Sequence, residues 1–299
     1  MELDQRLNEL RQMWPDLQWQ NARLIECDHD VVILDKSLVF RFLCENLEHE
    51  PLEREIQFLD RLRSRATIPV PDYTYIDEAY QVAGYPHIPG EPLDLSCWDG
   101  LTRDQRREIA VGVAKILNAI HGFPISEAEE LGIRRGNTPR EAVKDSLAFY
   151  NRIKRPGFLT EEEMKYCDDI ARSIGQANLY AEMPQCVIHG DIEYPHILHD
   201  GERLTGIIDF GDVLIGDPAR DFGRLWELGE GFVDDVLAHY HYHHGSENLK
   251  QRSHWFGLGN ALGMMDWGTR SHHQEAWERG YHFFPEGVSS PNRVMGLSK

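Results

Sequence analysis

Basic residues are scarce in this sequence. Its 299 residues include 31 lysines and arginines against 50 aspartates and glutamates, so the formal net charge is −19 with the histidines neutral. Such a surface repels nucleic acids and anionic membranes, which argues against a broad binding surface for either partner. Acidity of this kind serves solubility in many proteins, and it also suits a cationic small substrate. An apolar content of 41% is typical of a globular chain.

Paired cysteines and long hydrophobic runs are also missing. The five cysteines are widely spaced and form no C-x-x-C pair, which disfavours a disulfide framework or a structural zinc site. The N-terminal segment MELDQRLNELRQMW is charged and amphipathic, unlike a signal peptide. The longest uncharged, apolar-leaning run, residues 255–265, is too short to span a bilayer. We expect a cytoplasmic monomer that binds neither nucleic acid nor a membrane.

The first 90 residues carry the pattern of a small sheet. Apolar residues at helical spacing from Leu3 to Leu17 predict an opening amphipathic helix. A helix that starts with Pro51 as its first residue and carries an apolar stripe to Leu62 is expected after the third strand. Short β-branched and aromatic runs predict strands at 24–25, 31–34, 38–42, 73–76 and 80–83.

The rest of the chain reads as mostly helical. Thr102, Thr138 and Thr160 are predicted helix caps, and helices resume near Asp221. Short strands are expected between them at 186–188, 197–198 and 204–210. The sequence therefore predicts an α+β fold of two lobes that share a cleft. Residues 1–88 form the lobe with the sheet, and residues 89–299 form the helical lobe.

The segments most informative for function are V-I-H-G-D-I-E-Y-P-H-I-L at 187–198, G-I-I-D-F-G-D at 206–212 and G-D-P-A-R-D at 216–221. Asp191 follows the end of one predicted strand, His196 begins a second, and Asp209 follows a third. Neighbouring strands would bring these two carboxylates and the imidazole together, in a cluster able to hold a divalent cation and orient a nucleophile. Asp217 and Asp221 are interpreted as structural, in a turn and at the N-cap of the next helix.

These segments resemble the aminoglycoside phosphotransferases and related small-molecule kinases, which share a two-lobed fold with protein kinases. The family pattern is H-G-D-x-x-x-x-N, then I-D-[FW], then G-D-P-x-x-D, and the match is strong over residues 187–226. Weaker but ordered matches cover the rest of the chain. The resemblance implies a protein-kinase-like fold with a small antiparallel β-sheet lobe that contains one long helix.

The resemblance also implies how a nucleotide is bound. Arg41 matches the basic residue on the third strand that contacts the α- and β-phosphates, and Glu55 matches the helix glutamate that pairs with it. The backbone of the segment that includes Gly84, Tyr85 and His87 would hydrogen-bond the purine of ATP or GTP. An ordinary surface ion pair is the alternative reading of Arg41 and Glu55.

The catalytic roles follow from the same resemblance. Phosphoryl transfer depends on positioning and on charge neutralisation. Asp191 would orient and deprotonate the acceptor hydroxyl, while Asp209 and His196 would bind Mg²⁺. His196 stands where the family pattern has Asn, a replacement that is frequent in the 2″-aminoglycoside and macrolide phosphotransferases. A second departure is the first turn, 26–31, which lacks glycine, so we assign it no phosphate contact.

Acidic residues downstream of Asp191 suggest the acceptor. Protonated polyamines need carboxylates to replace water around their ammonium groups. The predicted substrate-binding residues are Glu193, Asp212, Glu227, Glu230 and Asp234. We expect an aminoglycoside antibiotic as acceptor, and hence a role in antibiotic resistance. The alternatives are a macrolide or another small molecule, or a nucleotide-binding relative without activity. A protein kinase is disfavoured, because no activation segment separates Phe210-Gly211 from Gly216-Asp217-Pro218.

Overall fold

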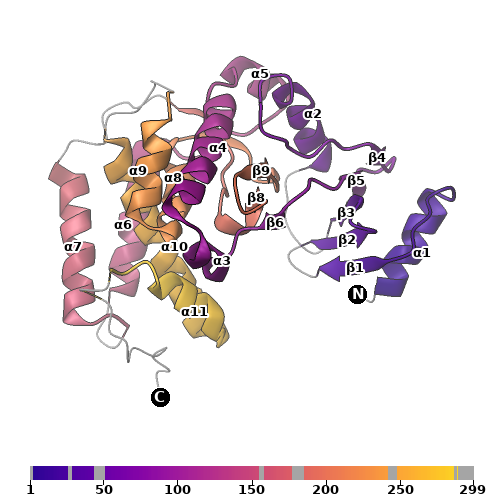
Figure 1. Cartoon of the computed structure of the whole chain (residues 1–299). Coiled ribbons are helices and arrows are strands. Elements are labelled where there is room, and N and C mark those ends of the chain that lie inside the picture. Colours follow the sequence, from indigo (N-terminus) through magenta and orange to yellow (C-terminus); the bar gives the residue numbers. More distant parts are fainter. Residues whose placement is uncertain are drawn as a thin grey trace.

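The computed structural model describes residues 3–25, 29–43, 51–154, 158–176, 185–241, 248–285 and 288. A small sheet with two helices lies at one end of the molecule, and most of the helices gather at the other end (Figure 1). The predicted class, an α+β fold with a small antiparallel sheet in the N-terminal lobe, is confirmed. Residues 26–28 of the glycine-free turn lie outside the described residues, as do Cys27 and Cys44.

The N-terminal sheet has five antiparallel strands in the order β1-β2-β3-β5-β4. They are β1 (Ala22–Ile25), β2 (Asp30–Leu34), β3 (Leu38–Phe42), β4 (Tyr75–Ile76) and β5 (Val82–Pro86). The fifth strand begins later than predicted, because the Asp77 carboxylate accepts hydrogen bonds from the Gln81 and Val82 N–H groups, each at 2.7 Å. This turn holds Tyr80 at a φ of 54°. Gly84 and Tyr85 therefore lie inside β5.

Two helices flank this sheet. Helix α1 (Leu3–Met13) ends before the predicted Leu17, although Trp14 continues to pack on Phe40 at a ring distance of 5.3 Å. Helix α2 (Leu52–Leu62) follows β3 as predicted, with Pro51 at its N-cap rather than inside the helix. The buried face of α2 places Glu55 toward the sheet, where its side chain reaches β3.

The helical lobe is built on α4, whose apolar stripe is fully buried. The predicted caps are present, since Thr102, Thr138 and Thr160 each accept the N–H of the residue three positions on. The helices of this lobe are α3 (Leu95–Gly100), α4 (Arg103–His121), α5 (Ile125–Glu130), α6 (Pro139–Ile153), α7 (Glu161–Gln176), α8 (Ala219–Leu225), α9 (Glu230–Ala238), α10 (Leu249–Ser271) and α11 (Gln274–Tyr281).

Short strands between the helices position the informative segments. They are β6 (Glu91–Pro92), β7 (Cys186–Ile188), β8 (Ile197–His199), β9 (Leu204–Ile207) and β10 (Leu214–Gly216). β7 pairs with β10, and β8 lies between β6 and β9. β6 and β10 were not predicted. β9 ends before the predicted Phe210, because Asp209 turns the chain with a φ of 67°. A 3-10 turn, η1 (Tyr194–His196), leads into β8.

The sequence disfavoured a disulfide framework and a membrane-spanning run. Cys97, Cys167 and Cys186 are free thiols. Within the described part of the chain, no helix combines the length and the apolar character that crossing a membrane requires.

Candidate active site

The loop that carries Asp191 is anchored by a buried carboxylate. Asp221 accepts the N–H of His189 at 2.8 Å and that of Gly190 at 2.9 Å, and it lies 3.0 Å from Nε2 of His121. Its burial acts to raise its pKa, but the hydrogen bond and charge of His121 outweigh this effect and lower the pKa of Asp221. The predicted N-cap role of Asp221 is wrong, because α8 starts at Ala219 and Asp221 lies in its first turn.

Gly190 is needed where this loop turns. Its φ is 89°, and a Cβ built there would lie 2.3 Å from the backbone oxygen of Asp212. A side chain would therefore push apart two segments, the one before Asp191 and the one after Asp209. The glycine of H-G-D thus brings these two segments into contact.

His196 faces two carboxylates with one ring nitrogen. Its Nδ1 lies 2.8 Å from the backbone oxygen of Asp191, and since a carbonyl only accepts, Nδ1 carries a hydrogen. In the neutral imidazole, Nε2 then presents a lone pair. It lies 3.3 Å from Oδ2 of Asp209 and 3.9 Å from Oε1 of Glu193. Nε2 and a carboxylate oxygen can both only accept a hydrogen bond here, so at 3.3 Å they need a cation or a proton between them.

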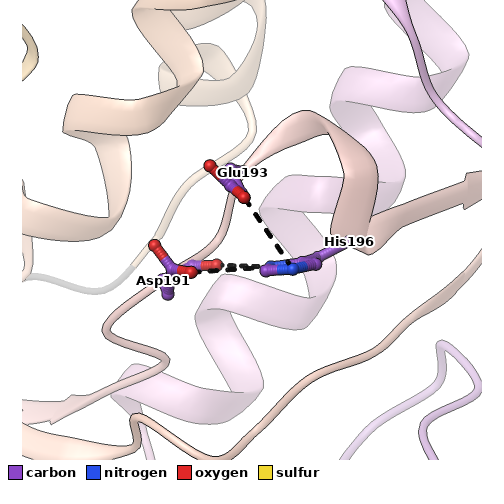
Figure 2. A group of neighbouring side chains, drawn as sticks. All are labelled: Asp191, Glu193 and His196. Carbon is purple, nitrogen blue, oxygen red and sulfur yellow. Dashed lines mark hydrogen bonds and ion pairs between the residues drawn. The ribbon is translucent and has the colours of Figure 1, made fainter. Parts of the chain in front are cut away.

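This geometry fits a divalent cation. Figure 2 shows the side chains of Asp191, Glu193 and His196 pointing toward one another, and their ligand atoms all lie within 4.8 Å of each other. Carboxylate oxygens are the ligands that Mg²⁺ prefers, and an imidazole is a softer addition. Glu193 was predicted only as a substrate-binding residue, and the structure adds it to the groups that could hold a metal.

Asp209 connects this cluster to the sheet lobe. Its Oδ1 lies 3.3 Å from Nη1 of Arg41, and its side chain is 43% exposed. The surrounding protein partly desolvates the carboxyl, which acts to raise its pKa, but the charges of Arg41 and His196 prevail, so the pKa of Asp209 lies below its ordinary value. Asp209 is therefore a carboxylate, held between an arginine and an imidazole.

The predicted pair of Arg41 and Glu55 is present and is largely buried. Nη1 of Arg41 donates to Oε2 of Glu55 at 2.9 Å. The hydroxyl of Tyr73 donates to the other oxygen, Oε1, at 2.9 Å. Gly211 lets the guanidinium approach, because a Cβ there would lie 3.0 Å from Nη2 of Arg41. Tyr73 was missed by sequence reasoning, and the buried pair is not an ordinary surface contact.

Two backbone groups of the predicted purine-binding segment already form hydrogen bonds within the N-terminal lobe. The Gly84 carbonyl accepts the Thr74 N–H at 2.9 Å, and the His87 N–H donates to the Ser37 carbonyl at 2.8 Å. The side chain of Tyr85 is buried against Tyr73. Purine contacts in this segment remain a prediction, and the His87 N–H is already used.

Two of the predicted substrate acids are bound by an arginine. Arg279 donates from Nη2 to Oε2 of Glu193 and from Nε to Oε2 of Glu227, both at 2.6 Å. Arg224 lies 3.3 Å from Oδ1 of Asp191. The pKa of Asp191 is raised by burial, an effect that Arg224 partly offsets. Neither arginine carries a signal in the sequence that would have identified it.

The other predicted substrate acids lie elsewhere. Lys250 of α10 binds both Glu230, at 2.8 Å, and Asp234, at 2.6 Å. Asp212 is exposed, and its backbone borders Gly190. The five acids are therefore not one surface: two contact the arginines beside Asp191, two contact Lys250, and one is exposed to solvent.

The chain is similar to known proteins in sequence and in fold. Residues 26–253 match the family described as the phosphotransferase enzyme family, APH. The uncharacterized protein YcbJ of Bacillus subtilis (strain 168) is 29% identical over 205 residues, which cover 64% of this chain and 64% of that protein. The chain thus spans just under two thirds of the length of this curated relative.

Solved structures share the fold over nearly the whole chain. The GDP and kanamycin complex of APH(2″)-IIIa superposes with a TM-score of 0.77 and 24% identity, covering 92% of this chain and 95% of that one. A macrolide 2′-phosphotransferase type I superposes with a TM-score of 0.65 and 20% identity, covering 93% and 95%. Because the family match covers most of the chain and includes the segments that form the site, the chain belongs to the phosphotransferase enzyme family.

Proposed function

We propose that this protein transfers the γ-phosphate of ATP or GTP to a hydroxyl group of a small molecule. The observation that carries the proposal is the convergence of His196, Asp209 and Arg41, with the imidazole and the guanidinium each 3.3 Å from the Asp209 carboxylate. A carboxylate between a metal-ligating imidazole and a cation suits a site that neutralises phosphate charge. The nucleotide would lie against residues 1–88 and the acceptor against residues 89–299.

Each side chain has a role in this proposal. Arg41 would contact the nucleotide phosphates while Glu55 and Tyr73 hold its guanidinium in place. Asp191 would orient the acceptor hydroxyl and take its proton. A carboxyl whose pKa is raised by burial is a stronger base than an ordinary aspartate, which favours this role.

The site also supports a role for Mg²⁺. His196 and Asp209 would hold the ion, through Nε2 and Oδ2, which lie 3.3 Å apart. When bound, Mg²⁺ supplies positive charge that neutralises the phosphate oxygens. The chain's own contribution is to fix the imidazole, because the bond from Nδ1 to the Asp191 carbonyl keeps Nε2 directed at the carboxylates.

The acceptor class is proposed from the relatives and the sequence. Solved neighbours include complexes with kanamycin and with gentamicin, and the acidic helical lobe led us to expect an aminoglycoside. Turnover of an aminoglycoside would support a role in resistance. A second candidate, a macrolide, is favoured by the arginines that hold Glu193 and Glu227, since a macrolide carries a single amine.

The test is phosphoryl transfer by the purified protein against a panel of aminoglycosides and macrolides, with ATP and GTP in parallel. We expect Mg²⁺-dependent transfer to at least one hydroxyl compound, and its loss in Asp191→Asn. Nucleotide binding without transfer to any compound would favour the non-catalytic relative. A protein that binds no Mg²⁺-nucleotide would refute the proposal.

A further inference from the structure

Two arginines from different helices contact a cluster of three acids, Asp191, Glu193 and Glu227. Arg279 of α11 binds Glu193 and Glu227 through two hydrogen bonds of 2.6 Å, and its guanidinium lies 4.4 Å from the centre of the Tyr194 ring. Arg224 of α8 lies 3.3 Å from Asp191. Its Nη1 lies 3.7 Å from Glu193 and 3.8 Å from Glu227.

These contacts leave little negative charge for a substrate. Three carboxylates, those of Asp191, Glu193 and Glu227, face two guanidinium groups, so these five groups together carry one net negative charge. The exposed carboxylate of Asp212 is a further acid near Asp191. Only 18% of the Arg279 side chain is exposed, and the exposed fractions of Glu193 and Glu227 are smaller. Charge-assisted hydrogen bonds strengthen when they are shielded from water, so an incoming ammonium group would have to displace strong, buried partners.

Arg279 is also held in place by its helix. α11 packs closely on α10, because a Cβ at Gly280 would lie 2.4 Å from the backbone oxygen of Ala261. Trp277, two residues before Arg279, is buried. The pKa of Arg279 is raised: burial acts against its charge, but Glu227 and Glu193 outweigh that effect. The guanidinium is therefore a permanent part of the site.

We propose that the acceptor carries at most one positive charge near its reacting hydroxyl, and that Arg279 sets this specificity by holding Glu193 and Glu227. The inference rests on the proposed kinase function and decides between its candidate acceptors, favouring a neutral or singly charged hydroxyl compound over an aminoglycoside. A polyamine such as kanamycin would find its carboxylate partners already bound and would meet two fixed positive charges.

The experiment compares kanamycin with its fully N-acetylated form, which keeps the ring hydroxyls and loses the positive charges. Both are titrated calorimetrically into protein saturated with Mg²⁺ and a non-hydrolysable ATP analogue. The proteins are the wild type, Arg279→Met, Arg279→Lys and the control Arg270→Met. Arg270 is an exposed residue of α10 that forms an ion pair with Asp266, so its loss changes the net charge equally.

We expect the wild type to bind kanamycin no more tightly than the acetylated form. Arg279→Met should bind kanamycin about tenfold or more tightly than the wild type, with acetylated kanamycin unchanged, because the two glutamates become free. Arg279→Lys and Arg270→Met should each stay within about threefold of the wild type. A purely structural role for Arg279 would change the affinity for both compounds alike.

Two results would overturn the inference. One is tight binding of kanamycin to the wild type that weakens steeply as salt rises, while the acetylated form fails to bind. The other is an Arg279→Met variant with unchanged kanamycin affinity. If that variant does not fold, the wild-type titrations decide alone. Failure of the kinase function itself is recognised separately, by a lack of nucleotide binding in the same samples.

Discussion

The carboxylate of Asp221 should stabilise the whole protein through the loop that carries Asp191. It is 1% exposed, and its two oxygens accept the N–H groups of His189 and Gly190 and face the imidazole of His121. Asp221→Asn keeps the shape of the side chain but replaces one acceptor oxygen by an amide that can only donate. Whichever way the amide is turned, it faces a backbone N–H that donates too.

The magnitude follows from these partners. A buried N–H left without an acceptor costs about 1–3 kcal/mol, and a hydrogen bond to a charged group is worth about 1.5–3 kcal/mol. We therefore expect Asp221→Asn to lower the free energy of unfolding by about 3 kcal/mol. At about 2.1 cal/mol/K per residue, the unfolding entropy of 299 residues is about 0.6 kcal/mol/K, which converts this loss into a Tm lower by about 5 °C.

Calorimetric unfolding at neutral pH measures this shift directly. Asp234→Asn is the matched control, because Asp234 is exposed and ion-paired only on the surface, so its Tm should change by no more than about 1 °C. A lower pKa in the folded protein means that the ionised carboxylate stabilises the fold. The Tm difference between wild type and Asp221→Asn should therefore hold from neutral pH down to about pH 4 and shrink below it.

An unchanged Tm in Asp221→Asn would refute this reasoning, because it would mean that the loop keeps its position without the buried carboxylate. A pH-independent Tm difference at acid pH would separately contradict the direction of the pKa. Measuring the activity of Asp221→Asn provides a second test. If Asp221 positions the loop, the variant should lose about tenfold or more in kcat at an almost unchanged nucleotide Kd.

Four further outcomes are expected. Asp191→Asn should lower kcat by about 10²–10⁴-fold, measured by steady-state kinetics, with nucleotide affinity by calorimetry within about twofold. Because burial raises the pKa of Asp191, kcat should fall with decreasing pH at a midpoint above about 4, and a midpoint at or below that value would count against Asp191 as the base. His196→Asn should keep activity within about tenfold, since an amide can both donate to the Asp191 carbonyl and ligate a metal, whereas His196→Leu should lose about 100-fold. Gly190→Ala should lower the free energy of unfolding in urea by about 2–4 kcal/mol, and a wild-type midpoint would contradict the close contact at its Cβ.

The sequence predicted those parts of the fold whose signals are local and periodic. The helices α2 and α4 each bury an apolar stripe, so their spacing alone identifies them. The strands β6 and β10 have two and three residues, too few for an alternating pattern to emerge. The start of β5 was misplaced because the side chain of Asp77, rather than any hydrophobic pattern, ends the preceding turn.

The site residues divide in the same way, into those that a local pattern predicts and those that meet only because distant segments pack together. Asp191, His196 and Asp209 lie within 19 residues and are brought together by short strands, so their spacing predicts their contact. Glu193 and Arg279 are 86 positions apart, and they meet only because α11 packs on α10. No pattern along the chain encodes such a contact. Tyr73, which completes the Arg41 and Glu55 pair, escaped notice for the same reason.

The net charge of −19 shows why contacts between distant residues matter for predicting function. Counting acids in the helical lobe suggested a surface prepared for a polycation, but the count ignores the partners of each acid. Lys250 binds two of the counted acids and Arg279 binds two others. Electrostatic specificity depends mostly on the charge left uncompensated within about 8 Å of the ligand, since salt largely screens exposed charges beyond that distance. An acidic composition is therefore compatible with a cluster around Asp191 in which arginines compensate most of the negative charge.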